Sequence, residues 1–128
     1  LHRGDPVLVD SEDVYTNHIH ADDLARAACL TIFRGKPNRV YNVCDNSHLK
    51  MGEYFDLMAQ VFGLSYPPRV TRDEARTVLS PATLSFMSES RQLSNRRLRE
   101  ELHIRLRYPD VREGLLTARA QTRFVEGE

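Results

Sequence analysis

The sequence has 128 residues and a mass of 14.8 kDa, a length that suits one domain rather than two. Hydrophobic residues make up 41% of the chain, which is enough for a core and excludes wholesale disorder. Eighteen basic and eighteen acidic side chains give a net charge of zero, so no overall field attracts nucleic acid or a membrane surface.

Two short strands are expected at the beginning of the chain. Residues 7–9 form an apolar run between polar residues. Residues 16–21 form a second strand candidate in which His18 and His20 share one face, because side chains alternate along a strand. The acidic stretch between the two candidates is expected to form a hairpin loop.

The first helix is expected over residues 24–33. Asp22 or Asp23 is placed to cap it, since a carboxylate there accepts hydrogen bonds from free backbone N–H groups and faces the positive end of the helix dipole. Arg34 and then Gly35 follow it, and the glycine is expected to end the helix in a left-handed conformation.

A strand over residues 39–43 and a helix over residues 52–62 come next. The strand is β-branched and aromatic. The helix shows the strongest periodicity in the chain, with Tyr54 and Leu57 among the apolar residues on one face, and Gly63 is expected to end it.

The second half of the chain carries mainly helix-start signals. They are the capping box Thr71-x-x-Glu74, the pair Ser80-Pro81, Ser94 ahead of a helix with Leu98 and Leu102, and the capping box Asp110-x-x-Glu113. Residues 104–108 alternate and predict a strand. We expect one domain over residues 1–120 and a frayed tail over residues 121–128. The alternation of strands and helices predicts a mixed α/β structure.

The sequence offers few candidates for chemistry. His18-x-His20 can share a metal with Asp22 or Asp23 as a third ligand; the alternative is that the histidines form structural hydrogen bonds while an aspartate caps the helix, which we favour. Neither a nucleophile elbow nor a glycine-rich phosphate loop is present. We therefore predict no catalytic, metal or cofactor-binding residues.

The two cysteines and the arginine-rich stretch have ordinary interpretations. Cys29 and Cys44 do not form a Cys-x-x-Cys motif and fit core positions in a reducing compartment, which predicts a cytoplasmic protein. The arginines between residues 91 and 107 alternate with Glu100 and Glu101, a pattern typical of a solvated helix face rather than a nucleic-acid site. Apolar runs are only a few residues long, which predicts no membrane span.

Several segments together resemble the extended short-chain dehydrogenase/reductase family, the NAD-dependent epimerases and dehydratases. Asn17-His-Ile-His-Ala-Asp-Asp-Leu-Ala resembles the family's I-H-V-x-D stretch, and Arg39-Val-Tyr-Asn-Val43 resembles the strand that follows. Ser94-Asn-Arg-Arg-Leu-Arg-Glu-Glu-Leu102 and Arg112-Glu-Gly-Leu115 resemble the two late motifs. These segments stand in the family's order.

The resemblance implies a C-terminal substrate-binding lobe with the Rossmann core largely absent. The family's Tyr-x-x-x-Lys pair is missing, because Ile32 and Asn46 stand four residues before the only lysines, Lys36 and Lys50. NAD or NADP and a small-molecule substrate are therefore expected of a full-length parent, and no cofactor of this chain alone. A chain that begins with Leu1 rather than Met fits this expectation.

The resemblance also suggests site residues. Thr16 stands where nucleotide-sugar members carry a diphosphate-binding Arg, which argues against a nucleotide sugar as substrate. The candidate substrate-binding residues are Thr16, Asn17, His18 and Arg91. His20, Asp22 and Asp23 are expected to have structural roles.

The alternative is a stand-alone, non-catalytic oligomerisation or binding module derived from the same fold. In the family, the strand at residues 39–43 extends the sheet of the dinucleotide-binding domain. If the chain is separated from that domain, the edge of this strand and one apolar helix face are exposed. Such exposed surface predicts a homo-oligomer. No nucleic-acid or membrane partner is expected.

Overall fold

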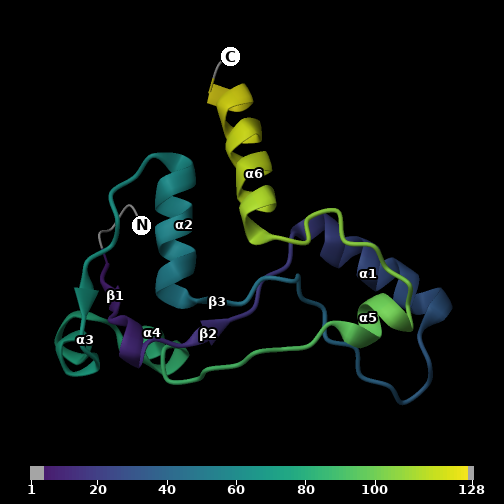
Figure 1. Ribbon diagram of the computed structural model, residues 1–128, viewed down its shortest axis with the longest axis horizontal. Helices are drawn as coiled ribbons and strands as arrows, with labels where there is room; N and C mark the ends of the chain where they lie inside the picture. Colours follow the sequence, from purple (N-terminus) through teal and green to yellow (C-terminus); the bar gives the residue numbers. More distant parts are fainter. Residues whose placement is uncertain (1–4, 127–128) are drawn as a thin grey trace.

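The computed structural model describes residues 5–126, which form a mixed α/β arrangement of short strands and helices (Figure 1). In chain order the elements are β1 (Val7–Leu8), the 3-10 helix η1 (Asp10–Glu12), β2 (Tyr15–Thr16), α1 (Ala21–Arg34), β3 (Leu49–Lys50), α2 (Met51–Phe62), β4 (Arg69–Val70), α3 (Arg72–Val78), α4 (Pro81–Phe86), α5 (Arg96–Glu100) and α6 (Val111–Glu126). The predicted mixed α/β class is confirmed at this level.

The strands pair over long distances in the sequence. β1 lies parallel to β4, with Leu8 opposite Val70, and β2 lies antiparallel to β3, with Thr16 opposite Leu49. The predicted hairpin between the first two strands is therefore wrong, because each strand has a distant partner. The acidic stretch between them instead forms η1.

The acidic stretch holds the beginnings of two later helices. The Asp13 carboxylate accepts a hydrogen bond of 2.7 Å from the backbone N–H of Gly52 at the start of α2, and the Glu12 carboxylate accepts from the N–H of Arg72 at the start of α3. A Cβ atom on Gly52 would lie 2.7 Å from the Asp13 carboxylate, so glycine makes room for this close approach. Anions at helix N-termini are stabilising because they face the positive end of the dipole.

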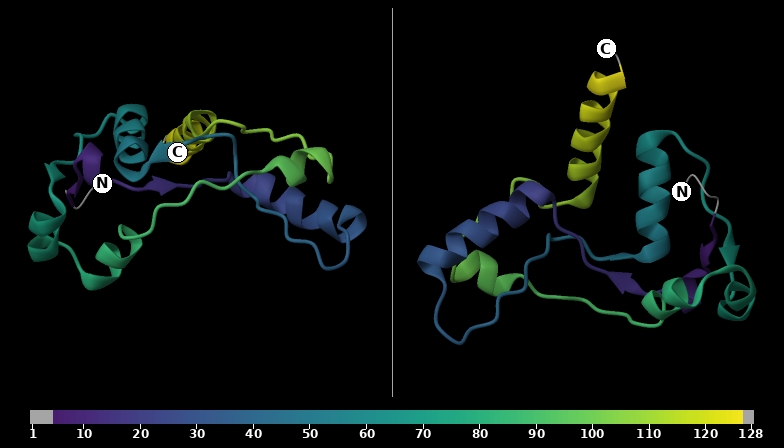
Figure 2. Two further views of the ribbon diagram at one scale, coloured as in Figure 1. Left: turned by 60° about the horizontal axis from the view of Figure 1, so that its bottom comes forward. Right: turned by 180° about the vertical axis from the view of Figure 1, so that it is seen from behind.

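Two separate apolar clusters form the core. One joins α1 to α5 and the segment after it, through Ala27, Leu98, Leu102 and Ile104. The other joins β1 to α3 and the residue after α4, through Leu8, Ala75 and Met87. Figure 1 shows α1 and α5 at one end of the molecule and β1, α3 and α4 at the other, with α2 and α6 between them. Figure 2 shows α1 and α5 side by side from two further directions, as expected from their shared cluster.

The structure confirms several helix predictions. α2 matches the expected helix, and Gly63 ends it with a φ of 68°, in the left-handed region. The capping box of Thr71 and Glu74 is formed at α3, and Ser80 caps α4 with Pro81 in its first turn. These signals act within one turn of helix, so the sequence contains all of their partners.

Two predicted strands are absent from the described part of the chain. Residues 39–43 have no strand partner; the Val40 carbonyl accepts from the Arg97 guanidinium, and Tyr41 packs against the α1–α5 cluster. Residues 104–108 also form no strand, because the N–H groups of Arg107 and Tyr108 donate to the carboxylate of Asp23 instead of to a neighbouring strand.

Other boundaries also differ from the predictions. The strand candidate at residues 16–21 is reduced to β2, and Gly35 ends α1 with an ordinary φ of −66°. α5 ends at Glu100, before Leu102. The tail expected to fray from residue 121 continues α6 to Glu126, and residues 127–128 lie outside the described part. Each added residue of a helix gains a hydrogen bond once the helix has begun, which favours this extension.

The arginines of the basic stretch are engaged in local bonds. Arg96 pairs with Glu100, Arg97 donates to the Val40 carbonyl, and Arg99 donates to the side chain of Asn95. These contacts leave fewer guanidinium donors for a phosphate backbone. None of the helices within residues 5–126 is long and apolar enough to cross a membrane.

Candidate functional site

The segment between β2 and α1 contains three of the candidate residues and is held by long-range hydrogen bonds. The Asn17 side chain donates to the carbonyl of Arg91 and accepts from the N–H of Leu93, both at 2.9 Å. The carbonyl of His18 accepts a 2.7 Å bond from the N–H of Asp45. Asn17 therefore uses its amide to tie two segments of the chain together.

His18 packs against α2. Its Nε2 atom forms a 2.9 Å hydrogen bond with the hydroxyl of Thr16, and its ring stacks on Tyr54 with centroids 4.1 Å apart. Burial lowers the pKa of His18, so the imidazole is neutral at physiological pH. Burial also raises the pKa of Tyr54, so the phenol keeps its proton.

His20 packs against the segment that leads into α6. Its ring stacks on Tyr108 with centroids 3.9 Å apart. Its Nδ1 atom accepts a 3.0 Å bond from the N–H of Asp22, which makes His20 the N-cap of α1. The expectation that Asp22 or Asp23 caps this helix is therefore wrong, because the helix begins at Ala21, ahead of both aspartates.

Asp23 has a different structural role. Its side chain is fully buried, and its two oxygens accept 2.9 Å bonds from the N–H groups of Arg107 and Tyr108. The Arg26 guanidinium lies 3.4 Å from one of these oxygens and also donates to the carbonyl of Arg105. Asp23 thus fixes the backbone that carries Tyr108, and so fixes the ring on which His20 stacks.

Both stacked pairs line one cavity of about 490 Å³, which we call the aromatic cavity. It lies between the β2–α1 segment, α2 and α6. Its lining residues are Asn17, His18, Ile19, His20, Ala21, Asp45, Tyr54, Tyr108, Asp110, Val111, Gly114, Leu115 and Ala118. Gly114 lets α6 approach closely, because a Cβ atom there would lie 3.1 Å from Cδ2 of His20.

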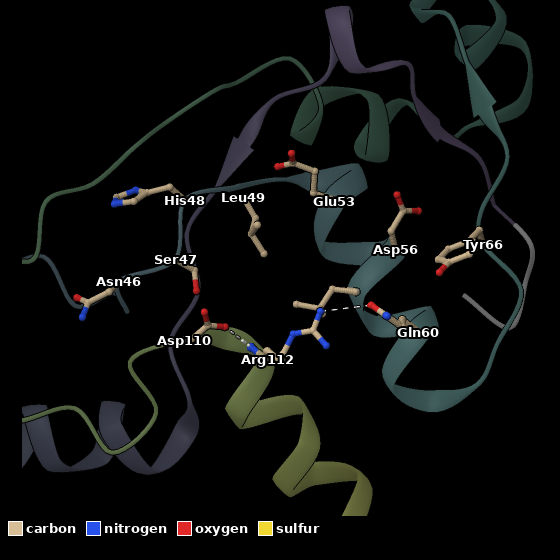
Figure 3. Close-up of a pocket in the computed structure, with 11 residues that line it drawn as sticks. Asn46, Ser47, His48, Leu49, Glu53, Asp56, Gln60, Tyr66, Asp110 and Arg112 are labelled. Carbon is tan, nitrogen blue, oxygen red and sulfur yellow. Dashed lines mark hydrogen bonds between the residues drawn. The ribbon is translucent and has the colours of Figure 1, made fainter.

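A second cavity of about 600 Å³ lies between α2 and α6, and we call it the polar cavity (Figure 3). Its lining residues are Asn46, Ser47, His48, Leu49, Glu53, Asp56, Leu57, Gln60, Tyr66, Asp110 and Arg112.

The charged groups of the polar cavity already have partners in the protein. Glu53 accepts from the N–H of Lys50, Asp56 pairs with Arg69, and Arg112 donates to Gln60. Groups that are already bonded in this way bind a ligand less readily, so we take the aromatic cavity as the candidate site.

Only some of the predicted substrate-binding residues lie at the aromatic cavity. Asn17 and His18 line the aromatic cavity, and Thr16 touches it only through its bond to His18. The Arg91 side chain is exposed and pairs with Glu89 at 2.8 Å, and it lines neither cavity. The exposed guanidinium therefore contributes nothing to the candidate site.

Sequence reasoning did not identify most of the lining of the aromatic cavity. Among the residues it did not predict for the site are Asp45, Tyr108, Asp110 and Gly114, and Tyr54 was interpreted only as part of an apolar helix face. No local pattern pairs a histidine with a tyrosine tens of residues away. The only signal in the sequence was Tyr54 itself, because a tyrosine hydroxyl is unusual on a helix face that packs into a core.

The metal hypothesis for the two histidines is not supported. Within residues 5–126 no group of three or more His, Cys, Asp or Glu side chains is arranged to hold a metal ion. His18 and His20 instead stack on different tyrosines.

The two cysteines are both free. Cys29 is exposed, and Cys44 is buried, which raises the pKa of its thiol.

Comparisons with known proteins give structural likeness without a function. No protein-family model matches the chain, and no curated protein matches it in sequence. The chain is similar to the solved structure of a functionally unknown conserved protein from Silicibacter pomeroyi DSS, with 36% identity and a TM-score of 0.77 over 85% of this chain. The crystal structure of gox2253 is similar in fold, with 19% identity and a TM-score of 0.63 over 87% of this chain. The chain spans only 39% and 38% of the lengths of these two proteins.

Proposed function

We propose that this chain is the C-terminal, substrate-binding part of a cytoplasmic NAD(P)-dependent protein of the epimerase/dehydratase type, and that it is not catalytic by itself. The observation that supports this most is the position of the segment Asn17–His20. This segment carries the clearest family resemblance, and it lines the aromatic cavity. A segment that resembles a motif of that family thus lines a cavity of a size that can hold a small molecule, which supports the proposal.

The lengths of the similar structures also support the proposal. Both are more than twice as long as the matched part, since the chain covers 39% and 38% of them. A fold of this kind therefore occurs inside larger proteins. The remaining part of such a protein would supply the dinucleotide-binding domain and the Tyr-x-x-x-Lys pair.

The helix N-termini within residues 5–126 do not fit the phosphates of NAD or NADP. A dinucleotide pyrophosphate binds at a helix N-terminus with free N–H groups after a glycine-rich turn. Here the N-terminus of α2 is filled by Asp13, that of α3 by its own Thr71, and that of α1 by His20. At the N-terminus of α6, the N–H groups of Val111 and Arg112 donate to the side chains of Ser47 and Asp110. We therefore assign the cofactor to another part of the protein and assign to this chain only the binding and orienting of substrate.

A chimera tests this proposal. The chain would replace the matching segment of the Silicibacter pomeroyi protein, and NAD(H) and NADP(H) binding would be measured by calorimetry for the chimera, that protein and the chain alone. We expect the first two to bind one of these dinucleotides and the chain alone to bind neither. Binding by the chain alone would overturn the proposal, and so would failure of both larger proteins to bind.

The second candidate function, a homo-oligomeric binding module, is favoured by one specific observation. Large apolar side chains are exposed near the end of α1, with Ile32 79%, Phe33 83% and Val40 71% exposed. The accessible surface of 8707 Å² also exceeds the roughly 7,000 Å² expected for a compact monomer of this mass. Surface of this kind is typical of an interface.

Light scattering distinguishes the two candidates. An oligomer predicts a mass at least twice 14.8 kDa for the pure chain, and a return to 14.8 kDa in Phe33→Ser. Phe86→Ser is the matched control, because Phe86 is 78% exposed and belongs to α4, which lies at the opposite end of the molecule from α1 in Figure 1. A monomer at high concentration would contradict the oligomeric module and leave the substrate-binding proposal in place.

A further inference from the structure

The lining of the aromatic cavity is rich in rings. His18, His20, Tyr54 and Tyr108 come from three separate segments of the chain, and the two stacked pairs hold their orientation. Aromatic side chains bury the flat apolar face of a ring compound more completely than flexible aliphatic chains do, at little entropic cost. The shape of the lining therefore favours a ring-shaped ligand.

The lining of the cavity disfavours an anion. Its lining contains Asp45 and Asp110 and neither lysine nor arginine. The histidine that faces α2 is neutral, because burial lowers the pKa of His18. Arg112, which directly follows Val111 in α6, lines the polar cavity and donates to Gln60 there. A phosphate or carboxylate in the aromatic cavity would lose its hydration and meet carboxyl groups rather than a cation.

The polar atoms of the lining can accept hydrogen bonds. Asp45 uses Oδ1 to accept from the N–H of Ser47, and Asp110 uses Oδ1 to accept from the N–H of Arg112. Among the described residues, no backbone N–H donates to the Oδ2 atom of either aspartate; the Ser47 side chain also hydrogen-bonds the Asp45 carboxyl, and burial raises the pKa of that carboxyl. Ring substituents that donate hydrogen bonds, such as hydroxyl or amine groups, would satisfy these atoms.

From these observations we infer that the aromatic cavity binds a ring compound that is neutral or positively charged and carries hydroxyl or amine groups, and not a phosphorylated or carboxylated one. The inference rests on the proposed function for the assignment of this cavity to the substrate. It narrows the substrate class of that site, which the resemblance leaves open.

Three probes with the same ring test the charge preference. Benzylamine, benzyl alcohol and benzoate would be titrated into the pure chain while the ring signals of the four aromatic residues are followed by NMR. We expect benzylamine and benzyl alcohol to shift these signals, with a Kd at least about tenfold below that of benzoate. Binding of benzoate as tightly as benzylamine would overturn the inference, and so would the absence of any shift with all three probes.

Gly114→Ala tests the location. The added methyl group would lie 3.1 Å from the ring of His20 and narrow the cavity, while alanine favours the helix. We expect a Tm close to that of the wild type, because the gain in helix propensity offsets the tight contact with His20, and a loss of probe binding of about tenfold or more. Leu116→Ala is the control on the same helix, because Leu116 is 47% exposed and does not line the cavity. Equal binding by Gly114→Ala and the wild type would contradict the assigned cavity.

The outcomes separate this inference from the proposed function. A preference for benzoate would overturn the substrate class and leave the dinucleotide result of the chimera untouched. Conversely, absence of dinucleotide binding in both the chimera and the Silicibacter pomeroyi protein would overturn the proposed function, while the probe preference would still describe the cavity. If Gly114→Ala does not fold, the three probes on the wild-type chain still decide the charge preference.

Discussion

Replacing Asp23 by alanine is expected to destabilise the protein far more than the same change at Asp22. The Asp23 side chain is fully buried and accepts from two backbone N–H groups, those of Arg107 and Tyr108, which lie 84 and 85 residues away. Each N–H group left without a partner in a partly buried place costs about 1–2 kcal/mol. The expected loss in free energy of unfolding is therefore about 3 kcal/mol, a large part of the stability of a typical domain.

Urea unfolding followed by circular dichroism measures this loss. With an m value of about 1.5 kcal/mol/M, a loss of about 3 kcal/mol lowers the urea midpoint by about 2 M. Asp22→Ala is the matched control, because the Asp22 side chain is 60% exposed and, among residues 5–126, its carboxylate approaches a basic side chain only at His20, 3.9 Å away. Asp22→Ala is expected to cost less than about 1 kcal/mol.

Asp23→Asn refines the same prediction. The amide oxygen can replace one carboxylate oxygen as acceptor, but the amide nitrogen cannot accept from the second N–H group. A loss between those of the alanine variants of Asp22 and Asp23 is expected. Equal midpoints for the alanine variants of Asp22 and Asp23 would refute the reasoning that this carboxylate holds the residues before α6.

Three further predictions follow from other parts of the fold. Leu98→Ala should cost about 2–5 kcal/mol in the same unfolding assay, because Leu98 is fully buried in the α1–α5 cluster; a loss below about 1 kcal/mol would contradict its place in the core. Gly63→Ala should cost about 1 kcal/mol, since its φ of 68° is strained for a Cβ-bearing residue while no neighbouring atom obstructs the added methyl, and Gly63→Asn should cost less. The lowered pKa of His18 means that the unfolded chain takes up a proton first as the pH falls below 6.5, so this group's contribution to stability is present above pH 6.5 and is lost as the pH falls towards the native pKa. Unfolding at pH 7.5 and 5.5 should show a smaller pH effect in His18→Gln than in the wild type, and an equal effect would contradict the prediction.

The aromatic cavity illustrates how far sequence reasoning reached. Asn17 and His18 were identified through a resemblance carried by one continuous segment, and both line the cavity. Arg91 was placed near the site only by its position in the family's order, and its side chain points instead to Glu89. Tyr54 and Tyr108 were not identified, because their stacking partners lie far away in the sequence.

The sequence by itself determined the elements whose partners lie within a turn or two. The helix over residues 51–62, its left-handed end at Gly63, and the caps at Thr71 and Ser80 all depend on groups no more than about four residues away. All the groups that form such a signal lie in one short stretch of sequence, so the local sequence is enough to predict these helix ends and caps.

Only the tertiary structure decided which extended segments become strands and where the site lies. Residues 104–108 alternate like a strand, yet the N–H groups of Arg107 and Tyr108 are taken by Asp23, which the sequence suggested as a helix cap. His20 took the cap instead, through its ring nitrogen. A backbone N–H group bonds to whichever acceptor the fold brings close to it. An acceptor 84 residues away cannot be predicted from the sequence pattern around the donor.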